Sequence, residues 1–547
     1  MSAYKHQFSQ VPQANIQRST FNRSHTHKTT FDAGQLIPVY VDEVLPGDTH
    51  TVDFTTFGRL ATPIAPVMDD IYITLHSFFV PNRLVMDKWE KLMGEQDNPG
   101  DSTDFPIPQL IDDQETGFPV GSLMDYMGLP TSNQANGLSV SALPFRAFNL
   151  IYNEWYRDQN LQDSLTVKTD QLPDKLSDNL YTIQRRGKRH DYFTSCLPTP
   201  QKGQPVDIAL GSTVDVDIAN LDVTTVNGGA IRFRQLNGAV PIGYDFRRVA
   251  QTGQVDAFGT TKTTGMGTGQ TTSYEGLKPV NLVASGSATA DLTTTSAMTI
   301  NDIRKSFALQ RLAETNMRSG TRYTETIKAH FGVTSPDARL QRPEFLGGGE
   351  CRLQMTPVPQ TESTQGGQTP QGNLAGYGTF ANSSGGFTKS FTEHGIIITL
   401  ASARAPLTYQ NGINKMWSRR TKYDHYFPSL ANLGEQAVLN KEIYASGTPT
   451  DDDVFGYQER WSELRYKPSL ITGKFRSNDP QSLDVWHLSQ DFSTTPNLNA
   501  SFIEDNPPVD RVLAVQNEPH FIVDMDIKCS TARPMPTYSV PGLSDHL

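Results

Sequence analysis

The sequence predicts a mainly β protein, a two-sheet sandwich with large loops, and three observations lead to this prediction. Charged residues make up only 19% of the 547 residues, so the polar character comes from Thr, Ser, Asn, Gln and Gly. Thr favours strands, whereas the 42 Gly and 35 Pro residues punctuate turns. Segments with strand character stand at both ends of the chain, and helical segments stand in the connections between them.

The strand pattern is clearest in four segments. Residues 52–61 (VDFTTFGRLA), 70–80 (DIYITLHSFFV) and 521–530 (FIVDMDIKCS) alternate between apolar and polar side chains, which is the period of a half-buried strand. Residues 395–405 (GIIITLASARA) instead read as an almost continuously apolar strand. These segments are the predicted core of the sandwich.

Helical periodicity appears at residues 86–95 (MDKWEKLMGE), 141–158 (SALPFRAFNLIYNEWYRD) and 299–318 (TINDIRKSFALQRLAETNMR). In the second of these, Ser141 is the predicted N-cap and Pro144 stands in the first turn, where proline is tolerated. We expect the first two helices to pack on a sheet.

The N-terminal residues 1–30 are predicted to form a basic arm. Although the whole chain has a net charge of -11, no Asp or Glu stands among its first 31 residues. The charge of the whole chain excludes a generally basic nucleic-acid binder, but a basic arm on an acidic body is a recognisable asymmetry. The cationic residues of the arm are Lys5, Arg18, Arg23 and Lys28.

The rest of the chain divides into three predicted parts. Residues 31–210 would form the first part of the core with helical loops. Residues 211–290 are rich in Thr, Gly, Ala and Val, and we interpret them as an inserted, solvent-exposed subdomain. Residues 291–547 would supply the rest of the core and long loops.

Neither export nor a membrane is indicated by the sequence. The three cysteines, Cys196, Cys351 and Cys529, are far apart and lack CxxC spacing, which favours a reducing compartment over a disulfide framework. The N-terminus lacks the apolar core of a signal peptide, and the longest apolar runs are too short to span a bilayer. We therefore expect a soluble protein, folded in a cytoplasm, with no membrane insertion.

The sequence offers no defensible catalytic constellation. It contains no GxxxxGK[ST], GxSxG or HExxH motif. His25 and His27 fit a basic arm better than a metal site, and the acidic run Asp451–Asp453 fits a solvated turn better than a calcium loop. The expectation is a protein without catalytic residues, metal or cofactor.

Two stretches combine cations with aromatic residues. Cations can follow a phosphate backbone while aromatic faces stack on unpaired bases, so such mixtures suit single-stranded nucleic acid. Subunit interfaces are also enriched in Arg, Tyr and Trp, so both interpretations stay open. The candidates are Arg185, Arg186, Lys188, Arg189, Tyr192 and Phe193 in the first stretch, and Trp417, Arg419 and Arg420 in the second.

Long motifs spread over nearly the whole chain resemble the major capsid protein of gokushoviruses, a branch of the Microviridae, which are small phages with single-stranded DNA. Residues 211–290 are the exception and occupy the position of the variable insertion of that family. The resembling stretches include FNRSHTHKTTFDAGQLIPVYVDEVLPGDT (21–49), KRHDYFTSCLPTPQKG (188–203), GTRYTETIKAHFGVTSPDARLQRPEFLGG (320–348), FTEHGIIITLASARAPLTYQNGINKMWSRRTKYDHYFP (391–428) and VFGYQERWSELRYKPSLITGKFR (454–476).

The resemblance implies an eight-stranded antiparallel jelly roll whose long loops contain several α-helices. It implies that copies of this chain build a small T=1 icosahedral shell around a circular single-stranded DNA genome in the bacterial cytoplasm. The insertion would form a protrusion near the threefold axes and meet a host surface receptor. Scaffolding, pilot and small DNA-binding phage proteins would be further partners.

Within this resemblance, residues 319–350 are interpreted as a connector that holds a long loop in one shape. Guanidinium groups donate several hydrogen bonds in a fixed fork and can hold backbone carbonyls or a neighbouring carboxylate. The interface or loop-fixing candidates are Arg322, His330, Asp337, Arg339, Arg342 and Glu344.

A β-sandwich carbohydrate-binding protein or glycosidase is the rival interpretation, because sandwich folds host both functions. A retaining glycosidase would place two carboxylates about 5 Å apart in a cleft. Size-exclusion chromatography discriminates the two, since a capsid protein forms very large particles or pentamers and the rival is a monomer.

Overall fold

The computed structural model describes residues 17–203, 300–318, 329, 341–362 and 370–538. Its contacts divide the chain into two units, residues 1–205 with 310–547 and residues 206–309. The predicted insertion at 211–290 lies outside the described residues.

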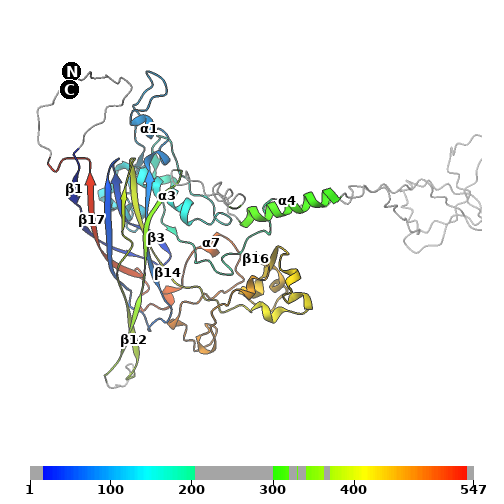
Figure 1. The fold of residues 1–547 in the computed structure, drawn as a ribbon. Helices are drawn as coiled ribbons and strands as arrows, with labels where there is room; N and C mark the ends of the chain where they lie inside the picture. The colour runs from blue at the N-terminus through cyan, green and yellow to red at the C-terminus, as the bar shows by residue number, and fades with distance from the viewer. Residues whose placement is uncertain (1–16, 204–299, 319–328, 330–340, 363–369, 539–547) are drawn as a thin grey trace, which may run out of the picture. The chain divides into compact units, whose positions relative to one another are not determined.

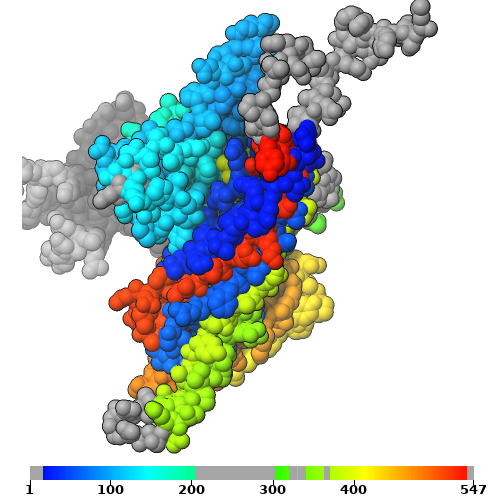
Figure 2. Space-filling view, turned by 90° about the vertical axis from the view of Figure 1, so that its left-hand side faces the viewer, coloured from blue at the N-terminus to red at the C-terminus, as the bar shows by residue number. Residues whose placement is uncertain are grey.

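Within the described residues, the first unit contains two large antiparallel sheets of seven and five strands and two smaller sheets of three and two strands (Figure 1). The seven-stranded sheet has β17 and β4 at its centre, β1 and β2 beyond β17, and β12, β13 and β11 on the other side. Figure 2 shows these strands side by side on one face. Their bounds are β1 Ser19–Asn22, β2 His25–Phe31, β4 Thr49–Leu60, β11 Gln354–Pro359, β12 Leu374–Ser383, β13 Phe387–Ser390 and β17 Phe521–Arg533.

The five-stranded sheet has the order β10-β5-β14-β3-β9, so β14 is its central strand. A β-bulge interrupts the pairing of β10 with β5 between Phe345 and Gly347. The bounds are β3 Gln35–Val44, β5 Tyr72–Pro81, β9 Gln184–Arg185, β10 Glu344–Arg352 and β14 Gly395–Arg404.

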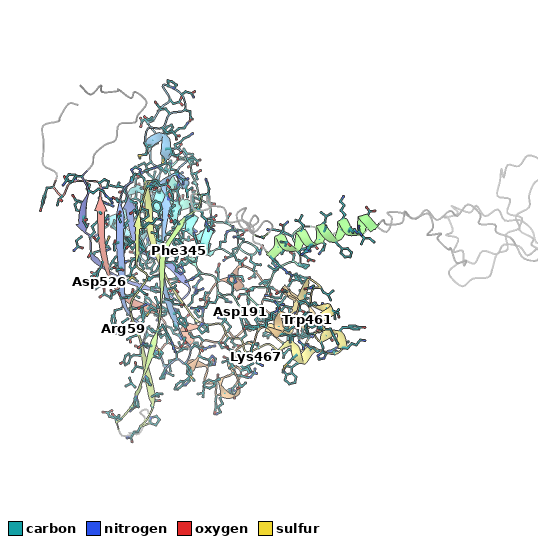
Figure 3. The ribbon with its side chains drawn as sticks, viewed as in Figure 1. Arg59, Asp191, Phe345, Trp461, Lys467 and Asp526 are labelled. Carbon is teal, nitrogen blue, oxygen red and sulfur yellow. The ribbon has the colours of Figure 1, made fainter. Side chains whose placement is uncertain are left out.

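The main core lies between the two sheets, because every second side chain of a strand points toward the other sheet and is buried there. β17 buries Phe521, Val523, Met525 and Ile527 and exposes the residues between them. Asp526 of β17 and Arg59 of β4, labelled in Figure 3, are on the exposed outer face. Side chains from β3, β5 and β14 complete the same cluster from the other sheet. This two-layer packing defines a β-sandwich.

The outer face of the five-stranded sheet is covered by a second core under a helical layer. Phe78, Ile396 and Ile398 of the sheet cluster with Phe145 and Phe148 of α3. Nine of the ten residues of β14 are therefore buried. The α-helices of the first unit include α1 Trp89–Leu92, α2 Leu123–Tyr126, α3 Leu143–Ile151, α6 Asn440–Ile443 and α7 Ala500–Ile503, and α4 Ile300–Arg318 crosses into the second unit.

Shorter elements shape the loops. A π-helix, η3 (Tyr152–Tyr156), continues α3. The remaining short strands are β6 Gln109–Ile111, β7 Ser139–Ser141, β8 Asp174–Lys175, β15 Glu435–Leu439 and β16 Val454–Glu459. The 3-10 helices are η1 Asn82–Leu84, η2 Ser132–Ala135, η4 Leu176–Asp178, η7 Lys415–Ser418, η8 Lys422–Asp424, η9 Pro428–Leu430, η10 Pro449–Asp452, η11 Ser462–Leu464, η12 Gly473–Phe475, η13 Asp484–Trp486 and η14 Val509–Arg511.

A buried ion pair holds the helical layer together. Arg146 of α3 is fully buried and donates hydrogen bonds to both carboxylate oxygens of Asp174, at 2.9 and 3.0 Å. Its Nη1 also donates to the backbone oxygen of Asp170 at 2.7 Å, and the Tyr181 hydroxyl donates to Asp174 at 2.5 Å. One side chain thereby fixes the loop that follows α3.

The predicted class is confirmed, since the fold is a mainly antiparallel β-sandwich with helices in its connections. The strand count differs from the expected eight within the described residues, because short segments such as β1, β9 and β13 pair at the ends and edges of the sheets. The helix expected at 86–95 shortens to α1, and Gly94 follows it in a left-handed conformation. The helix expected at 141–158 has Ala142 rather than Ser141 at its N-cap and changes to a π-helix after Ile151.

In the part of the chain that the structure describes, no helix is both long and apolar enough to cross a membrane.

We expect Arg146→Ala to lower the free energy of unfolding by about 3–5 kcal/mol, because the buried Asp174 carboxylate loses two charge-assisted hydrogen bonds and keeps only Tyr181 and the more distant Lys168 as partners. Arg465→Ala is the matched control, since Arg465 pairs with Glu459 at the exposed surface and should contribute less than about 1 kcal/mol. Urea unfolding of the unassembled protein measures both changes. Equal losses in the two variants would contradict this account of the helical layer.

Candidate nucleic-acid interface

The residues expected in a basic arm divide into paired and unpaired cations. Residues 19–22 and 25–31 form β1 and β2, which both pair with β17. Arg23 binds Asp42, and Lys28 binds Asp524 at 3.0 Å on the exposed surface. Arg18 is exposed and donates to the Thr49 hydroxyl at 2.9 Å, so it has no carboxylate partner among the described residues. Lys5 lies outside them.

Arg23 belongs to a polar network inside the sandwich. It donates two hydrogen bonds to the carboxylate of Asp42, at 2.6 and 2.7 Å, and the Tyr40 hydroxyl donates a third at 2.8 Å. Burial by itself would raise the pKa of Asp42, but the hydrogen bonds from Arg23 and Tyr40 outweigh it, and the pKa is lowered. The network connects the segment between β1 and β2 to β3.

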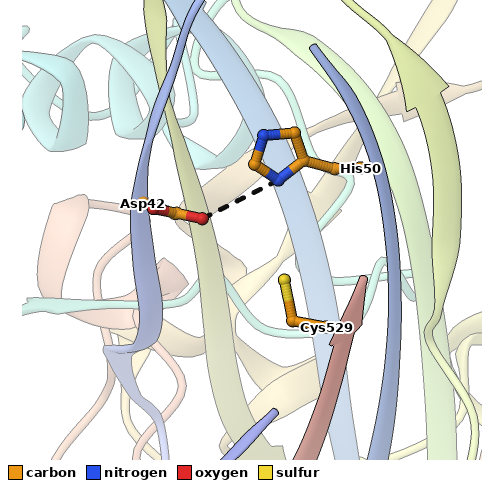
Figure 4. A group of neighbouring side chains, drawn as sticks. All are labelled: Asp42, His50 and Cys529. Carbon is orange, nitrogen blue, oxygen red and sulfur yellow. Dashed lines mark ion pairs between the residues drawn. The ribbon is translucent and has the colours of Figure 1, made fainter. Parts of the chain in front are cut away.

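Asp42, His50 and Cys529 are the described groups whose spacing most resembles a metal site (Figure 4). Their ligand atoms lie within 4.8 Å of one another. Both oxygens of Asp42 already accept hydrogen bonds from Arg23, whose positive charge opposes a cation at the same place. His50 also contacts the buried Asp48, at 3.3 Å from its Nε2. The cluster therefore serves as a polar connection between the two sheets, through β3, β4 and β17.

The basic stretch, residues 184–193 (QRRGKRHDYF), is held by backbone hydrogen bonds on both sides. Its first two residues form β9 and pair with β3. The Arg186 backbone N–H donates to the Gly34 carbonyl at 2.8 Å, and the Lys188 N–H donates to the Ile503 carbonyl at 2.7 Å. The Asp505 N–H donates back to the Arg186 carbonyl at 2.8 Å. This ladder fixes the positions of the cations.

The cations of the basic stretch differ in their surroundings. Arg185 donates to the Asn506 side chain at 2.9 Å, and Arg189 pairs with Glu350 and lies over the Tyr72 ring. Arg186 and Lys188 are both buried. Arg186 donates to the Ser402 hydroxyl at 2.8 Å, and the Lys188 ammonium lies 4.3 Å from the centre of the Phe502 ring. Burial lowers the pKa of both groups, that of Lys188 to about 8.

Tyr192 and Phe193 are core residues rather than exposed stacking surfaces. The Tyr192 hydroxyl donates to Glu442 at 2.9 Å, and its ring stacks on Tyr466. Phe193 packs edge-on against Tyr409 in the same buried cluster. Their rings are satisfied within the subunit, which sequence spacing alone could not show.

The second basic–aromatic stretch follows Lys415, whose ammonium donates to the Ala437 carbonyl of β15 at 3.0 Å. Trp417 is 75% exposed, whereas Arg419 binds the carboxylate of Glu463 at 3.2 Å. Arg420 is exposed, and its guanidinium has no hydrogen-bond partner among the described residues. Trp461, labelled in Figure 3, is buried nearby and donates to the Leu430 carbonyl at 3.1 Å.

Two of the six loop-fixing candidates lie in the described residues. The Arg342 guanidinium stands 4.9 Å from the centre of the Trp155 ring, and Glu344 pairs with Lys389 at 2.9 Å. Both contacts connect the start of β10 to other elements. The other candidates, Arg322, His330, Asp337 and Arg339, lie outside the described residues.

Sequence reasoning missed three residues that the fold brings beside the basic stretch. Arg404 ends the apolar strand β14, Trp155 lies in the π-helix η3, and Phe345 begins the bulge of β10. All three line one cleft with Arg186 and Lys188. An arginine at the end of an apolar strand was the only available signal, and it is a weak one.

Comparisons with known proteins cover nearly the whole chain. A family model described as capsid protein (F protein) matches residues 9–543. The chain is 45% identical over 543 residues to capsid protein VP1 of Bdellovibrio phage phiMH2K, with 98% of each chain covered. It is 42% identical over 607 aligned residues to capsid protein VP1 of Chlamydia phage 1 and 38% identical over 564 to that of Spiroplasma virus 4, with 99% of this chain and 98% of each relative covered.

These matches define a structural protein of a virus particle rather than an enzyme. The chain belongs to the F protein family of phage capsid proteins, which confirms the resemblance to gokushovirus major capsid proteins. The glycosidase interpretation is therefore set aside. A member of this family assembles with copies of itself into the shell of a virion.

We expect Arg23→Ala to lower the free energy of unfolding at neutral pH by about 1–3 kcal/mol, because Asp42 loses two charge-assisted hydrogen bonds. The pKa of Asp42 lies below its ordinary value of 3.8, so this stability is present above that pH and is lost as the pH falls through the lowered pKa. Urea unfolding between neutral and acidic pH measures the difference. Lys28→Ala, which removes an exposed pair, should cost less than about 1 kcal/mol. A loss in Arg23→Ala that does not shrink in acid would contradict the assignment.

Proposed function

We propose that this chain self-assembles into a T=1 icosahedral shell that encloses a circular single-stranded DNA genome. The observation that carries the proposal is the match to phage capsid proteins along almost the entire length. The confirmed gokushovirus resemblance supplies the genome type and the shell symmetry. Scaffolding, pilot and small DNA-binding phage proteins are the further partners in this proposal.

Exposed apolar side chains support extensive contacts between copies. Large groups of this kind are spread over the loops of the first unit, where a lone soluble subunit would expose them to water. Burial between neighbouring copies in a closed shell removes that exposure, and stable contacts usually bury more than about 1,000 Å². The most exposed of the large apolar residues include Met68, Leu172, Trp417, Tyr423 and Leu470.

For the genome, the proposal relies on cations that carboxylates of the same subunit do not neutralise. Arg18 is such a cation at the start of the seven-stranded sheet, and Lys5 precedes it in the acid-free N-terminal segment. Binding through phosphates and base faces would carry weak sequence preference, because every sequence presents both.

The proposal gives residues 211–290 the role of the threefold protrusion that contributes to attachment at a host surface receptor. Their composition, poor in aromatic residues and rich in Thr and Gly, supports a role outside the core. They stand where the variable insertion of the family stands.

We expect cryo-electron microscopy of particles assembled from the full-length chain to show T=1 icosahedral symmetry. The physical reason is that identical subunits joined by the same contacts form a closed shell only when symmetry relates them. The control is the same preparation examined before assembly, which should hold small oligomers. A final state of monomers or unclosed sheets would contradict the proposal.

The double variant Lys5→Gln with Arg18→Gln should form shells that contain less nuclease-protected DNA, because two unpaired cations are removed. Lys28→Gln is the matched control, since Asp524 already neutralises Lys28. DNA content per particle is measured after nuclease treatment. If the double variant fails to form shells while the DNA affinity of the unassembled protein is unchanged, the segment is an assembly element.

A further inference from the structure

An open cleft of about 1050 Å³ lies between the basic stretch and one edge of the five-stranded sheet. β5 and β10 line one side of it with residues that include His76 and Phe345, the latter labelled in Figure 3. The π-helix η3, the loop after it, residues 186–190, Arg318, Arg404 and Ile503 complete the lining. All of these residues belong to the first unit.

The lining is strongly cationic. Six cationic side chains face it, against the two carboxylates of Asp158 and Glu350. Glu350 already pairs with Arg189, and Arg318 pairs with Glu435, which does not line the cleft. The excess of positive charge therefore favours an anionic ligand. The six cations are Arg157, Arg186, Lys188, Arg189, Arg318 and Arg404.

Lys188 brings an unused set of donors to the cleft. Its side chain is buried, with 8% exposed, and the ammonium contacts the Phe502 ring. Among the described residues the ammonium contacts this ring but donates no hydrogen bond and forms no ion pair, although three N–H donors are available. Its nitrogen is not fully enclosed, so an oxyanion in the cleft can reach these donors and satisfy them.

Arg404 lines the same cleft and also lacks partners in the described part of the chain. Its guanidinium has no hydrogen bond or ion pair within the described residues, and its Nε atom is buried without a partner. Burial, together with the neighbouring Arg186 and Arg189, lowers the pKa of Arg404 to about 10. An anion bound in the cleft beside Arg404 would offset the repulsion between Arg404 and its neighbours Arg186 and Arg189.

Asp505 supplies a counter-charge without occupying these donors. It is 1% exposed, and both of its carboxylate oxygens lack a hydrogen-bond partner in the described structure. Burial raises its pKa to about 6, and its charge favours the protonated forms of Lys188 and Arg404. The cations are thus kept charged while their N–H groups stay free.

Aromatic rings stand on the side of the cleft formed by β5, β10 and η3. Phe345 is 43% exposed and contacts the rings of His76, Phe78 and Trp155, with centroid distances of 5.6, 5.5 and 5.9 Å. Trp155 is 39% exposed but already has the Arg342 guanidinium 4.9 Å from its ring centre, so Phe345 is the ring that is open to a ligand. A planar base can stack on such rings whatever its sequence.

We propose that this cleft binds a short stretch of single-stranded nucleic acid, with phosphate at Lys188 and Arg404 and a base against Phe345. The inference rests on the proposed function, because it names the place where a subunit would hold the enclosed genome. A purely acidic peptide would leave the aromatic rings unused. A duplex would not offer an unstacked base face.

The test uses the unassembled full-length protein and a fluorescent oligothymidylate of about eight nucleotides, a length within the usual site size. Lys188→Gln and Arg404→Gln should each weaken binding and lower the slope of log affinity against log salt by about 0.7. Phe345→Ala should weaken binding by about fivefold to a hundredfold with an unchanged slope. Lys188→Arg, which keeps the charge, should bind nearly as wild type does.

Arg465→Gln is the matched control, because Arg465 is exposed and does not line the cleft. Thermal unfolding of every variant shows whether it is folded, and the exposed position of Phe345 keeps the test available if a buried substitution fails to fold. Inorganic phosphate is the second probe. The proposal is overturned if Phe345→Ala keeps the oligonucleotide affinity of wild type and phosphate competes equally strongly with the oligonucleotide in both proteins. The cleft would then be an oxyanion site without a base-stacking surface.

Particle formation is scored separately by electron microscopy, so the two proposals fail in different ways. If shells form and the cleft variants bind the oligonucleotide as wild type does, the cleft proposal is overturned and the shell proposal stands. If wild type binds through the cleft but forms no icosahedral particle, the shell proposal is overturned.

Discussion

Burial of the five-stranded sheet on both faces is the constraint on which the rest of the structure depends. A strand such as β14, apolar almost throughout, needs one partner layer on each side. The seven-stranded sheet covers one face, and the helical layer around α3 covers the other. Long loops are therefore required, because the chain between β5 and β9 must leave the sheet, form the helical layer over it and return to the sheet.

This arrangement also explains why the fold contains buried charge. Loops that cover a sheet bring polar backbone into the interior, and its carbonyl groups need donors. Arg146 supplies several donors from one side chain, and Asp174 neutralises it. The Arg23–Asp42 pair performs a similar role inside the sandwich, where it connects the N-terminal strands to β3.

The same packing separates cations with two different roles. Arg23, Lys28 and Arg419 are neutralised by carboxylates of the same subunit, so they stabilise the fold and offer little to a nucleic acid. Lys188 and Arg404 are held without such partners beside exposed aromatic rings. In a protein with a net charge of -11, the cations that carboxylates of the same subunit leave unneutralised are the ones that can bind a polyanion.

The sequence by itself determined the sandwich class, the strand periodicity of residues 521–530, the central apolar strand and the capsid family. Each of these depends on local periodicity or on motifs that are continuous in the chain. The partners of individual cations did not follow from it, because Asp42, Asp524 and Glu463 lie elsewhere in the sequence. Only the tertiary structure placed Tyr192 and Phe193 in a core and brought Arg404 and Phe345 beside Lys188. Such neighbours are set by how the sheets and loops pack, and packing joins residues that no sequence spacing connects.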